Sequence, residues 1–166
     1  MSGAPFRLLP LDAAHDRSTF NSGSKPLDRY FREQVTQDIR RRITACFVAI
    51  SRDGTLAGYY TLASASLLLG DLPENLSRKL PRYPSIPAVR MGRLAVDLAF
   101  KGQGLGGVLL ADAMTRAVRS EIATYALVVD AKDNAAANFY RHYGFIAMAR
   151  EPLILFLPLA TAPILT

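Results

Sequence analysis

The sequence predicts a mixed α/β fold that forms a single domain over residues 1–166. Half of the 166 residues are hydrophobic, which is enough to bury one substantial core but too little for two. Two β-rich runs flank the turn signal Arg-Asp-Gly and predict an antiparallel hairpin over residues 45–64. A strand–helix–strand–helix pattern over 89–143 then predicts parallel strands, so the sheet is expected to be mixed.

The chain before the hairpin is expected to hold one strand and one helix. Residues 6–11, FRLLPL, form a short apolar run typical of a strand. In residues 25–42 the apolar side chains recur with helical spacing: Leu27, Tyr30, Phe31, Val35 and Ile39. Ser24 is the expected N-cap of this helix, and Pro26 falls in its first turn.

The chain after the hairpin begins with a long connection. Residues 70–87 contain four of the ten prolines and predict a short helix inside an irregular segment. Connections of this length inside a compact domain tend to be functional. The remaining expected elements are a strand at 89–97, a glycine loop at 101–107, a helix at 105–119, a strand at 125–131, a helix at 134–143, and strands at 145–149 and 153–159.

The charge of the chain favours a polyanionic partner. Lys and Arg number 20 against 14 Asp and Glu, which gives a formal net charge of +6 and a pI near 9.8. An excess of this size is equally compatible with a solvated basic surface. The distribution of the basic residues therefore has to decide between the two.

No pattern in the sequence points to a membrane, a disulfide or a metal. No stretch approaches the roughly 20 apolar residues of a spanning helix, and the first residues lack a signal-peptide layout, so we expect a cytoplasmic protein with no membrane partner. The single cysteine, Cys46, lies in an apolar run and is expected in the core. The two histidines, His15 and His142, form no metal-ligating cluster, so no metal is expected.

The segment KGQGLGG, residues 101–107, has four glycines in seven positions between a strand and a helix. It lacks the Gly-Lys-Ser/Thr ending of a Walker loop. Gly102, Gly104 and Gly107 match the dinucleotide pattern G-x-G-x-x-G, and Asp130 follows at the end of the next strand. However, too little chain follows Asp130 for the further βα units of that fold.

A third interpretation needs only a strand, a glycine turn and a helix. Backbone N–H groups at a helix N-terminus bind anions, and glycines let a pyrophosphate approach them closely. A tight strand-to-helix turn without a ligand usually needs only one or two glycines. The sequence therefore favours a pyrophosphate site.

Two longer segments carry a family resemblance. RLAVDLAFKGQGLGGVLLADA and VVDAKDNAAANFYRHYGF resemble the GNAT superfamily of acetyl-CoA-dependent N-acetyltransferases, whose loop pattern is Gln/Arg-x-x-Gly-x-Gly/Ala. Lys101 departs from this pattern at its first position, and Asp133 stands where the family often has asparagine. The resemblance implies the GNAT-type acyl-CoA N-acyltransferase fold, with a central mixed sheet of about six to seven strands flanked by helices.

The same resemblance implies the residues of a donor site for acetyl-CoA. Leu94, Ala95 and Val96 would offer backbone groups to the pantetheine arm and the acetyl group. The implied pyrophosphate loop consists of Lys101, Gly102, Gln103, Gly104, Leu105, Gly106 and Gly107. Phe139 would also contact acetyl-CoA, and Tyr140 matches the tyrosine that acts as the general acid for the thiolate. Tyr143 is expected to be a packing residue.

GYYTLAS, LPRYPSIPAVRMGRLAVD and FYRHYGF together resemble one branch of the superfamily. That branch comprises the toxins of bacterial toxin–antitoxin pairs that acetylate the α-amine of aminoacyl-tRNA and so block translation. This implies aminoacyl-tRNA and an antitoxin as partners, with a ribbon–helix–helix protein expected for the antitoxin and a homodimer as one expectation for the enzyme. Two alternatives stay open: acetylation of a small amine or a protein N-terminus, and a non-catalytic regulator that binds acyl-CoA or nucleic acid.

Two observations from the residues bear on the substrate. The sequence offers no obvious strong base, which suits an α-amine with a reference pKa near 8 better than a lysine amine near 10.4. Basic residues also gather at three places, which we expect to contact tRNA phosphates: Arg40, Arg41 and Arg42; Arg78, Lys79 and Arg82; and Arg90 and Arg93. Arg40–Arg42 are equally explained by the helix dipole, and Arg93 can instead point into the acceptor pocket.

Overall fold

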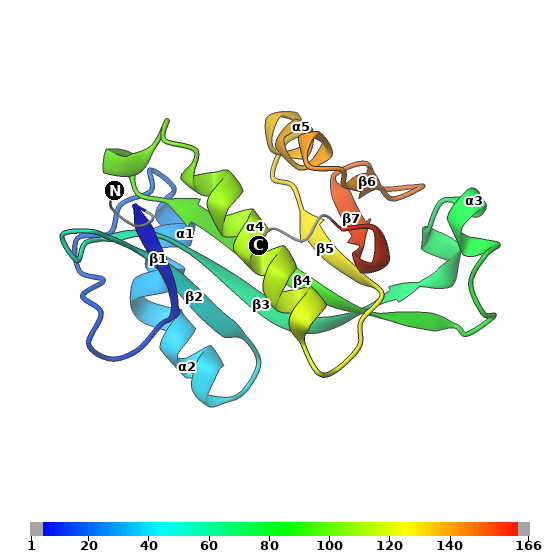
Figure 1. Ribbon diagram of the computed structural model, residues 1–166, viewed down its shortest axis with the longest axis horizontal. Helices are drawn as coiled ribbons and strands as arrows, with labels where there is room; N and C mark the ends of the chain where they lie inside the picture. The colour runs from blue at the N-terminus through cyan, green and yellow to red at the C-terminus, as the bar shows by residue number, and fades with distance from the viewer. Residues whose placement is uncertain (1–4, 163–166) are drawn as a thin grey trace. The chain divides into compact units, whose positions relative to one another are not determined.

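The computed structural model describes residues 5–162, whose seven strands form one sheet in the order β1-β2-β3-β4-β5-β7-β6 (Figure 1). The strands are β1 (Phe6–Pro10), β2 (Ala45–Ser51), β3 (Leu56–Leu68), β4 (Ser85–Val96), β5 (Ala126–Asp130), β6 (Ile146–Ala147) and β7 (Ile154–Pro158). β2 pairs antiparallel with β1 and β3, β4 pairs parallel with β5, and β7 pairs antiparallel with β5 and β6. The predicted mixed α/β class is confirmed.

The helices are α1 (Lys25–Arg29), α2 (Val35–Arg40), α3 (Glu74–Ser77), α4 (Leu105–Arg119) and α5 (Asn134–His142). A π-helical turn, η1 (Tyr30–Gln34), joins α1 to α2, and short 3-10 turns are η2 (Leu69–Asp71), η3 (Leu98–Phe100) and η4 (Leu159–Thr161). None of the helices in the described part of the chain is long and apolar enough to cross a membrane.

Several boundaries differ from the sequence prediction, most by one or two residues, and three of them are instructive. The helix predicted over 25–42 ends at Arg40, because Arg42 takes a left-handed φ of 60° that a helix cannot continue. β3 runs on to Leu68, and β4 begins at Ser85 inside the connection predicted over 70–87. The sequence prediction missed this start because the segment PSIP contains two prolines, which are unusual in strands. The structure shows the alternation of a strand there, with Ile86 and Ala88 buried and Ser85 and Pro87 exposed.

The described chain divides into two compact units. The first contains the residues up to Ala63 together with Gly92–Ala113, and the second contains Ser64–Met91 together with the residues from Met114 onward. β3, β4 and α4 each contribute residues to both units. A single domain over residues 1–166 stays a prediction.

The helical segment of the first unit is anchored on β3 by aromatic packing. Ser24 caps α1 as predicted, because its hydroxyl accepts a hydrogen bond from the Leu27 N–H. The rings of Phe31 and Tyr59 stack with centroids 4.2 Å apart, and the Tyr59 hydroxyl donates to the Leu27 carbonyl at 2.7 Å. The buried core of this unit comprises Phe20, Tyr30, Phe31, Val35, Cys46, Val48, Ile50, Leu56, Tyr59 and Ala95.

The second unit is built around β5, whose residues Ala126–Val129 are all buried. β5 pairs with β4 over Ala88–Met91 on one side and with β7 on the other. Its core comprises Leu67, Leu72, Ala88, Ala126, Val128, Met148 and Phe156. A central strand buried on both faces reads as a continuous apolar run, which is why ALVV was predictable as a strand.

Within the first unit, β3 lies very close to β4 and α4 at Gly58. A Cβ atom added to Gly58 would lie 2.9 Å from the Ala95 carbonyl oxygen and 3.0 Å from the Leu109 Cδ1 atom. The carbonyl belongs to backbone and cannot rotate away. The absence of a side chain at Gly58 therefore sets the spacing between these three elements.

Gly58→Ala should lower the free energy of unfolding by about 1–3 kcal/mol, because the added methyl group forces β4 or α4 to move. Urea denaturation measures the loss. Gly70→Ala is the matched control, since an added Cβ there meets no atom within 4 Å. Equal stability of the two variants would contradict the close approach.

Candidate functional site

The glycine loop lies in the first unit and joins β4 to α4. Gly102 and Gly104 have φ values of +81° and +78°, which L side chains rarely adopt, and an added Cβ at either position would meet no atom within 4 Å. The glycines are therefore required by backbone conformation and leave open space beside the loop. Lys101 and Gln103, between them, are exposed.

The loop ends at the N-terminus of α4, where backbone N–H groups become available. The Gly104 carbonyl accepts the first helical hydrogen bond, from Val108, at 3.2 Å. Buried Leu105 anchors the first turn, whereas Gly106 and Gly107 are only partly buried. The first N–H groups of a helix have no partner within the helix, and its dipole favours negative charge there. This arrangement suits a phosphate or pyrophosphate.

Asp97 holds the chain between β4 and the loop, and its role was not found from the sequence. One of its carboxylate oxygens accepts from the Ala99 N–H at 2.9 Å and the other from the Asn21 N–H at 3.0 Å. Its own N–H donates to the Ala57 carbonyl at 2.8 Å. An aspartate directly after a strand and before a short helical turn is an N-cap signal that the sequence does contain.

The predicted pantetheine-binding residues Leu94, Ala95 and Val96 lie at the end of β4. Ala95 is buried, while Leu94 and Val96 are half-buried. The pairing of β4 with β5 covers Ala88–Met91, so these three residues lie further along β4 than the paired stretch.

Tyr140 belongs to the second unit and lies on α5. Its side chain is 8% exposed, and its ring packs against Phe139 and Phe145 with centroids 5.2 Å and 5.6 Å away. Burial raises the pKa of Tyr140 to about 12, and the negative charge of Asp130 acts in the same direction. Its hydroxyl makes no hydrogen bond to any residue that the structure describes. The group is thus a protonated phenol with a free donor.

The start of α5 explains the departure at Asp133. The Asp133 carboxylate accepts from the Ala136 N–H at 2.8 Å and caps the helix, a task for which aspartate and asparagine are equally suited. Phe139 is half-buried and packs its ring against Tyr140 and Tyr143.

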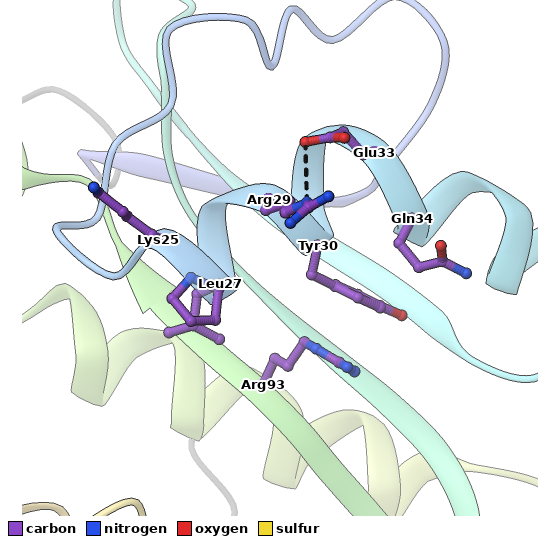
Figure 2. A pocket seen from close by; sticks show the side chains of 8 residues that line it. Lys25, Leu27, Arg29, Tyr30, Glu33, Gln34 and Arg93 are labelled. Atoms are coloured by element: carbon purple, nitrogen blue, oxygen red, sulfur yellow. Dashed lines mark ion pairs between the residues drawn. The ribbon is translucent and has the colours of Figure 1, made fainter.

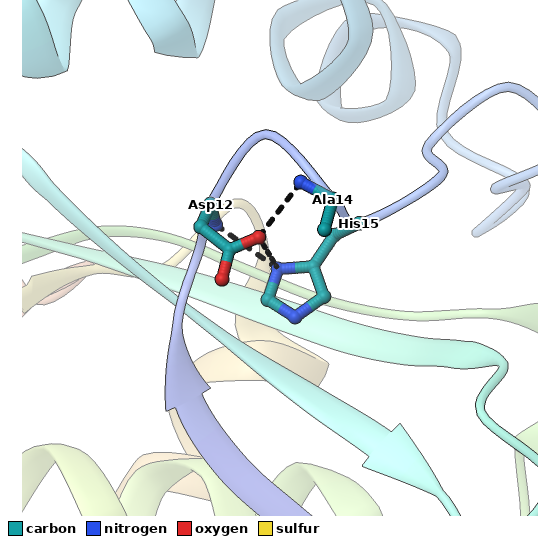
Figure 3. A network of polar contacts seen from close by, with 3 residues as sticks. All are labelled: Asp12, Ala14 and His15. Carbon is teal, nitrogen blue, oxygen red and sulfur yellow. Dashed lines mark hydrogen bonds and ion pairs between the residues drawn. The ribbon is translucent and has the colours of Figure 1, made fainter.

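The histidines and the cysteine offer no strong base or nucleophile. His15 closes a turn after β1, where its Nδ1 atom accepts from the Asp12 N–H at 3.0 Å (Figure 3). His142 is exposed at the end of α5 and packs edge-on against Tyr143. Cys46 is 4% exposed, as predicted for a core residue, and burial raises the pKa of its thiol to about 12. Among the described residues, no three His, Cys, Asp or Glu side chains group in a way that could hold a metal ion.

Two exposed sets of basic residues match the predicted tRNA contacts, one in each unit. Arg40–Arg42 lie at the C-terminal end of α2 in the first unit. Arg78, Lys79 and Arg82 lie after α3 in the second unit. Neither set forms an ion pair with a residue in the described part of the chain, so both can meet phosphates from solvent.

The side chains of Arg90 and Arg93 lie in different surroundings, although both residues belong to β4. Arg90 forms an ion pair with Asp130 of the neighbouring strand, so its charge is engaged within the second unit. Arg93 belongs to the first unit and lines a pocket of about 660 Å³ with Lys25, Pro26, Leu27, Arg29, Tyr30, Glu33 and Gln34 (Figure 2). The sequence left the place of Arg93 open, and the structure directs it into this pocket.

Comparison with known proteins places these features in one family. The family model described as "Acetyltransferase (GNAT) domain" matches residues 18–153. A tRNA-acetylating toxin of Mycobacterium tuberculosis (strain ATCC 25618 / H37Rv) is 37% identical over 161 residues, which are 95% of this chain and 93% of that protein.

Two solved structures are similar over nearly the whole chain. AtaT complexed with acetyl-methionyl-tRNAfMet has a TM-score of 0.86 at 29% identity, covering 94% of this chain and 96% of that one. A tyrosine-to-phenylalanine variant of the AtaT toxin, bound to the C-terminus of the antitoxin AtaR and to acetyl-CoA, has a TM-score of 0.79 at 25% identity, covering 95% and 96%. The resemblance found in the sequence is thereby confirmed, and the chain belongs to the GNAT acetyltransferase family.

Proposed function

We propose that this protein is an acetyl-CoA-dependent N-acetyltransferase toxin that acetylates the α-amine of aminoacyl-tRNA and so blocks translation. The observation that carries the acetyl transfer is the glycine loop, which leaves open space at the N-terminus of α4 through two left-handed glycines. The substrate follows from the relatives, which include a tRNA-acetylating toxin and a toxin bound to acetyl-methionyl-tRNA.

The donor site uses backbone groups of the first unit. The amides of residues 102–107 bind the pyrophosphate of acetyl-CoA, and Leu94–Val96 offer backbone groups to the pantetheine arm. When bound, acetyl-CoA supplies an activated acetyl thioester. Holding that thioester next to the amine lowers the barrier by several kcal/mol, on the order of what orientation alone can contribute.

Tyr140 provides the proton that the reaction consumes at sulfur. The amine nitrogen forms a bond to the acetyl carbon, the carbon–sulfur bond breaks, and the Tyr140 Oη atom gives its proton to the leaving sulfur while the amine loses one to solvent. A phenol whose pKa is raised to about 12 stays protonated at neutral pH. The same burial disfavours a thiolate anion beside it, which keeps the transfer favourable. Phe139 packs beside this tyrosine and is proposed as a further contact of acetyl-CoA.

The acceptor is bound through charge. Arg40–Arg42 and the set Arg78, Lys79 and Arg82 contact tRNA phosphates, and Arg93 lies in the acceptor pocket. Arg90 is engaged by its ion pair with Asp130 and is left out of this set. An α-amine needs little help to lose its proton, since its reference pKa is near 8.

We further propose that the protein acts in the cytoplasm and is held inactive by an antitoxin of the ribbon–helix–helix type, with a homodimer as the active form.

Gly104→Val should abolish acetyl-CoA binding, because a β-branched side chain cannot hold a φ of +78° and the loop amides turn away from the pyrophosphate. Calorimetric titration with acetyl-CoA measures the loss. Gly54→Val is the matched control, since Gly54 has a φ of +85° and equally open space but lies in the β2–β3 turn. Unchanged affinity in a folded Gly104→Val variant would remove the loop from the donor site.

Tyr140→Phe should lower kcat by about 10²- to 10⁴-fold with nearly unchanged acetyl-CoA affinity, because only the proton donor is lost. Tyr143→Phe, which removes a hydroxyl from the same helix end, should keep full activity. In the unmodified enzyme, kcat should not fall between about pH 7 and pH 10, since a pKa of about 12 leaves Tyr140 protonated throughout. Full activity of Tyr140→Phe would make it a packing residue.

Replacing Arg78, Lys79 and Arg82 together by alanine should weaken binding of aminoacyl-tRNA and reduce its salt dependence by up to about three charges. Acetyl-CoA affinity should stay the same. Arg119→Ala, which removes an exposed charge at the end of α4, serves as the control. Acetylation of charged tRNA is compared with that of a free amino-acid ester at several salt concentrations. Equal rates for both at every salt concentration would instead favour a small-amine acetyltransferase.

A further inference from the structure

Arg93 is half-buried, yet no residue that the structure describes accepts a hydrogen bond from its guanidinium. Arg93 makes no side-chain hydrogen bond or ion pair to any residue in the described part of the chain. Arginine carries five N–H donors in a planar fork and does not lose its charge at any physiological pH. Half-buried donors of this kind need an acceptor, and the pocket in front of them supplies the space for one.

Tyr30 holds this guanidinium in a fixed orientation. The Arg93 guanidinium carbon lies 3.4 Å from the centroid of the Tyr30 ring, so one flat face of the fork is covered by the ring (Figure 2). The Tyr30 hydroxyl donates to the Asp38 carboxylate at 2.7 Å, and the Gln34 amide donates to the other oxygen at 3.2 Å. The hydroxyl end of the ring is thus tied through Asp38, and the edge of the guanidinium stays open to a ligand.

The backbone around Tyr30 departs from regular α-helical geometry. Its carbonyl accepts from the Val35 N–H, five residues on, which makes Tyr30–Gln34 a π-helical turn within an otherwise α-helical segment. Such insertions are rare and occur frequently at functional sites. Here the insertion carries Tyr30, Glu33 and Gln34, all three of which line the pocket.

The charge of the pocket selects an anion. Lys25, Arg29 and Arg93 line it together with one carboxylate, that of Glu33, which pairs with Arg29 at 3.7 Å (Figure 2). The Asp38 carboxylate beside Tyr30 also interacts with the charge of Arg93, so three cations face two carboxylates and the balance stays positive. The edge of a guanidinium binds two oxygens of a phosphate at once, which a lysine cannot do. A phosphodiester therefore fits these donors better than a neutral carbonyl does.

We infer that this pocket binds a backbone phosphodiester of the tRNA substrate through Arg93, and that Tyr30 is the positioning residue that aims Arg93 at it. The inference rests on the proposed function for the identity of the nucleic acid. It adds a defined phosphate subsite and a residue, Tyr30, that acts on the substrate only through another side chain.

The test measures the dissociation constant of aminoacyl-tRNA without acetyl-CoA, so that binding is read independently of turnover. Arg93→Ala should weaken binding about 10- to 100-fold and lower the salt slope by about one charge. Arg93→Lys should keep the salt slope but not restore affinity, because it lacks the fork and the stacked face. Arg7→Ala, an exposed arginine on β1 of the same unit, is the control that should change neither.

Tyrosine variants separate positioning from structure. Tyr30→Leu should weaken tRNA binding about fivefold or more, whereas Tyr30→Phe keeps the ring and should stay within about threefold of the unmodified protein. The double variant Tyr30→Leu/Arg93→Ala should bind no more weakly than Arg93→Ala, because the tyrosine acts only through the arginine. A purely structural tyrosine would lower stability in Tyr30→Leu and leave the tRNA dissociation constant unchanged.

The inference would be overturned by unchanged tRNA binding in Arg93→Ala, by additive losses in the double variant, or by a loss of acetyl-CoA affinity, which would assign the pocket to a phosphate of acetyl-CoA. Equal losses for charged and uncharged tRNA support a backbone phosphate, whereas a loss confined to charged tRNA overturns it in favour of the aminoacyl group. Failure of the proposed function appears separately, as absent acetylation by the unmodified protein.

Discussion

The close approach of backbone at Gly58 is the constraint on which the candidate donor site depends. β3 lies against the Ala95 carbonyl of β4 and against Leu109 of α4, with no room for a side chain between them. The glycine loop connects those same two elements. The ends of the loop are therefore held at a fixed spacing, and its glycines take their left-handed φ values at no steric cost.

Two aspartate carboxylates, of Asp97 and Asp28, hold loops of the first unit in place by hydrogen bonds. Asp97 joins the end of β4 to Asn21, and Asp28, only 4% exposed, accepts from both the N–H and the hydroxyl of Ser22. A buried carboxylate is tolerated because these donors replace its lost hydration. The segment around Ser22 is thereby tied both to β4 and to the helix that bears Tyr30, so both regions of the first unit share one support.

The two units divide the chemistry of the molecule. The loop amides and the Arg93 pocket, both candidate phosphate sites, belong to the first unit, whereas the candidate acid Tyr140 and the basic set Arg78, Lys79 and Arg82 belong to the second. Backbone amides do not titrate and arginine stays charged near neutral pH. Burial keeps the pKa of Tyr140 far above neutral pH, so its phenol stays protonated. In the proposed reaction, the substrate amine, with a reference pKa near 8, is therefore the group that titrates near neutral pH.

Local patterns in the sequence determined the elements and the donor loop. Helix α4 has the predicted bounds Leu105–Arg119, and Ser24 caps α1, because periodicity and capping depend on residues a few positions apart. The glycine spacing likewise identified the loop, since a left-handed backbone needs glycine wherever the rest of the chain lies.

Only the tertiary structure decided how the charged side chains are used. Arg90 and Arg93 lie three positions apart on β4, yet one pairs with Asp130 and the other stacks on Tyr30. The π-helical turn was equally hidden, because its apolar residues fit an α-helical period and the insertion appears only in the hydrogen bonds. Each of these features depends on partners distant in sequence, and neither residue type nor local spacing encodes which partners the fold brings together.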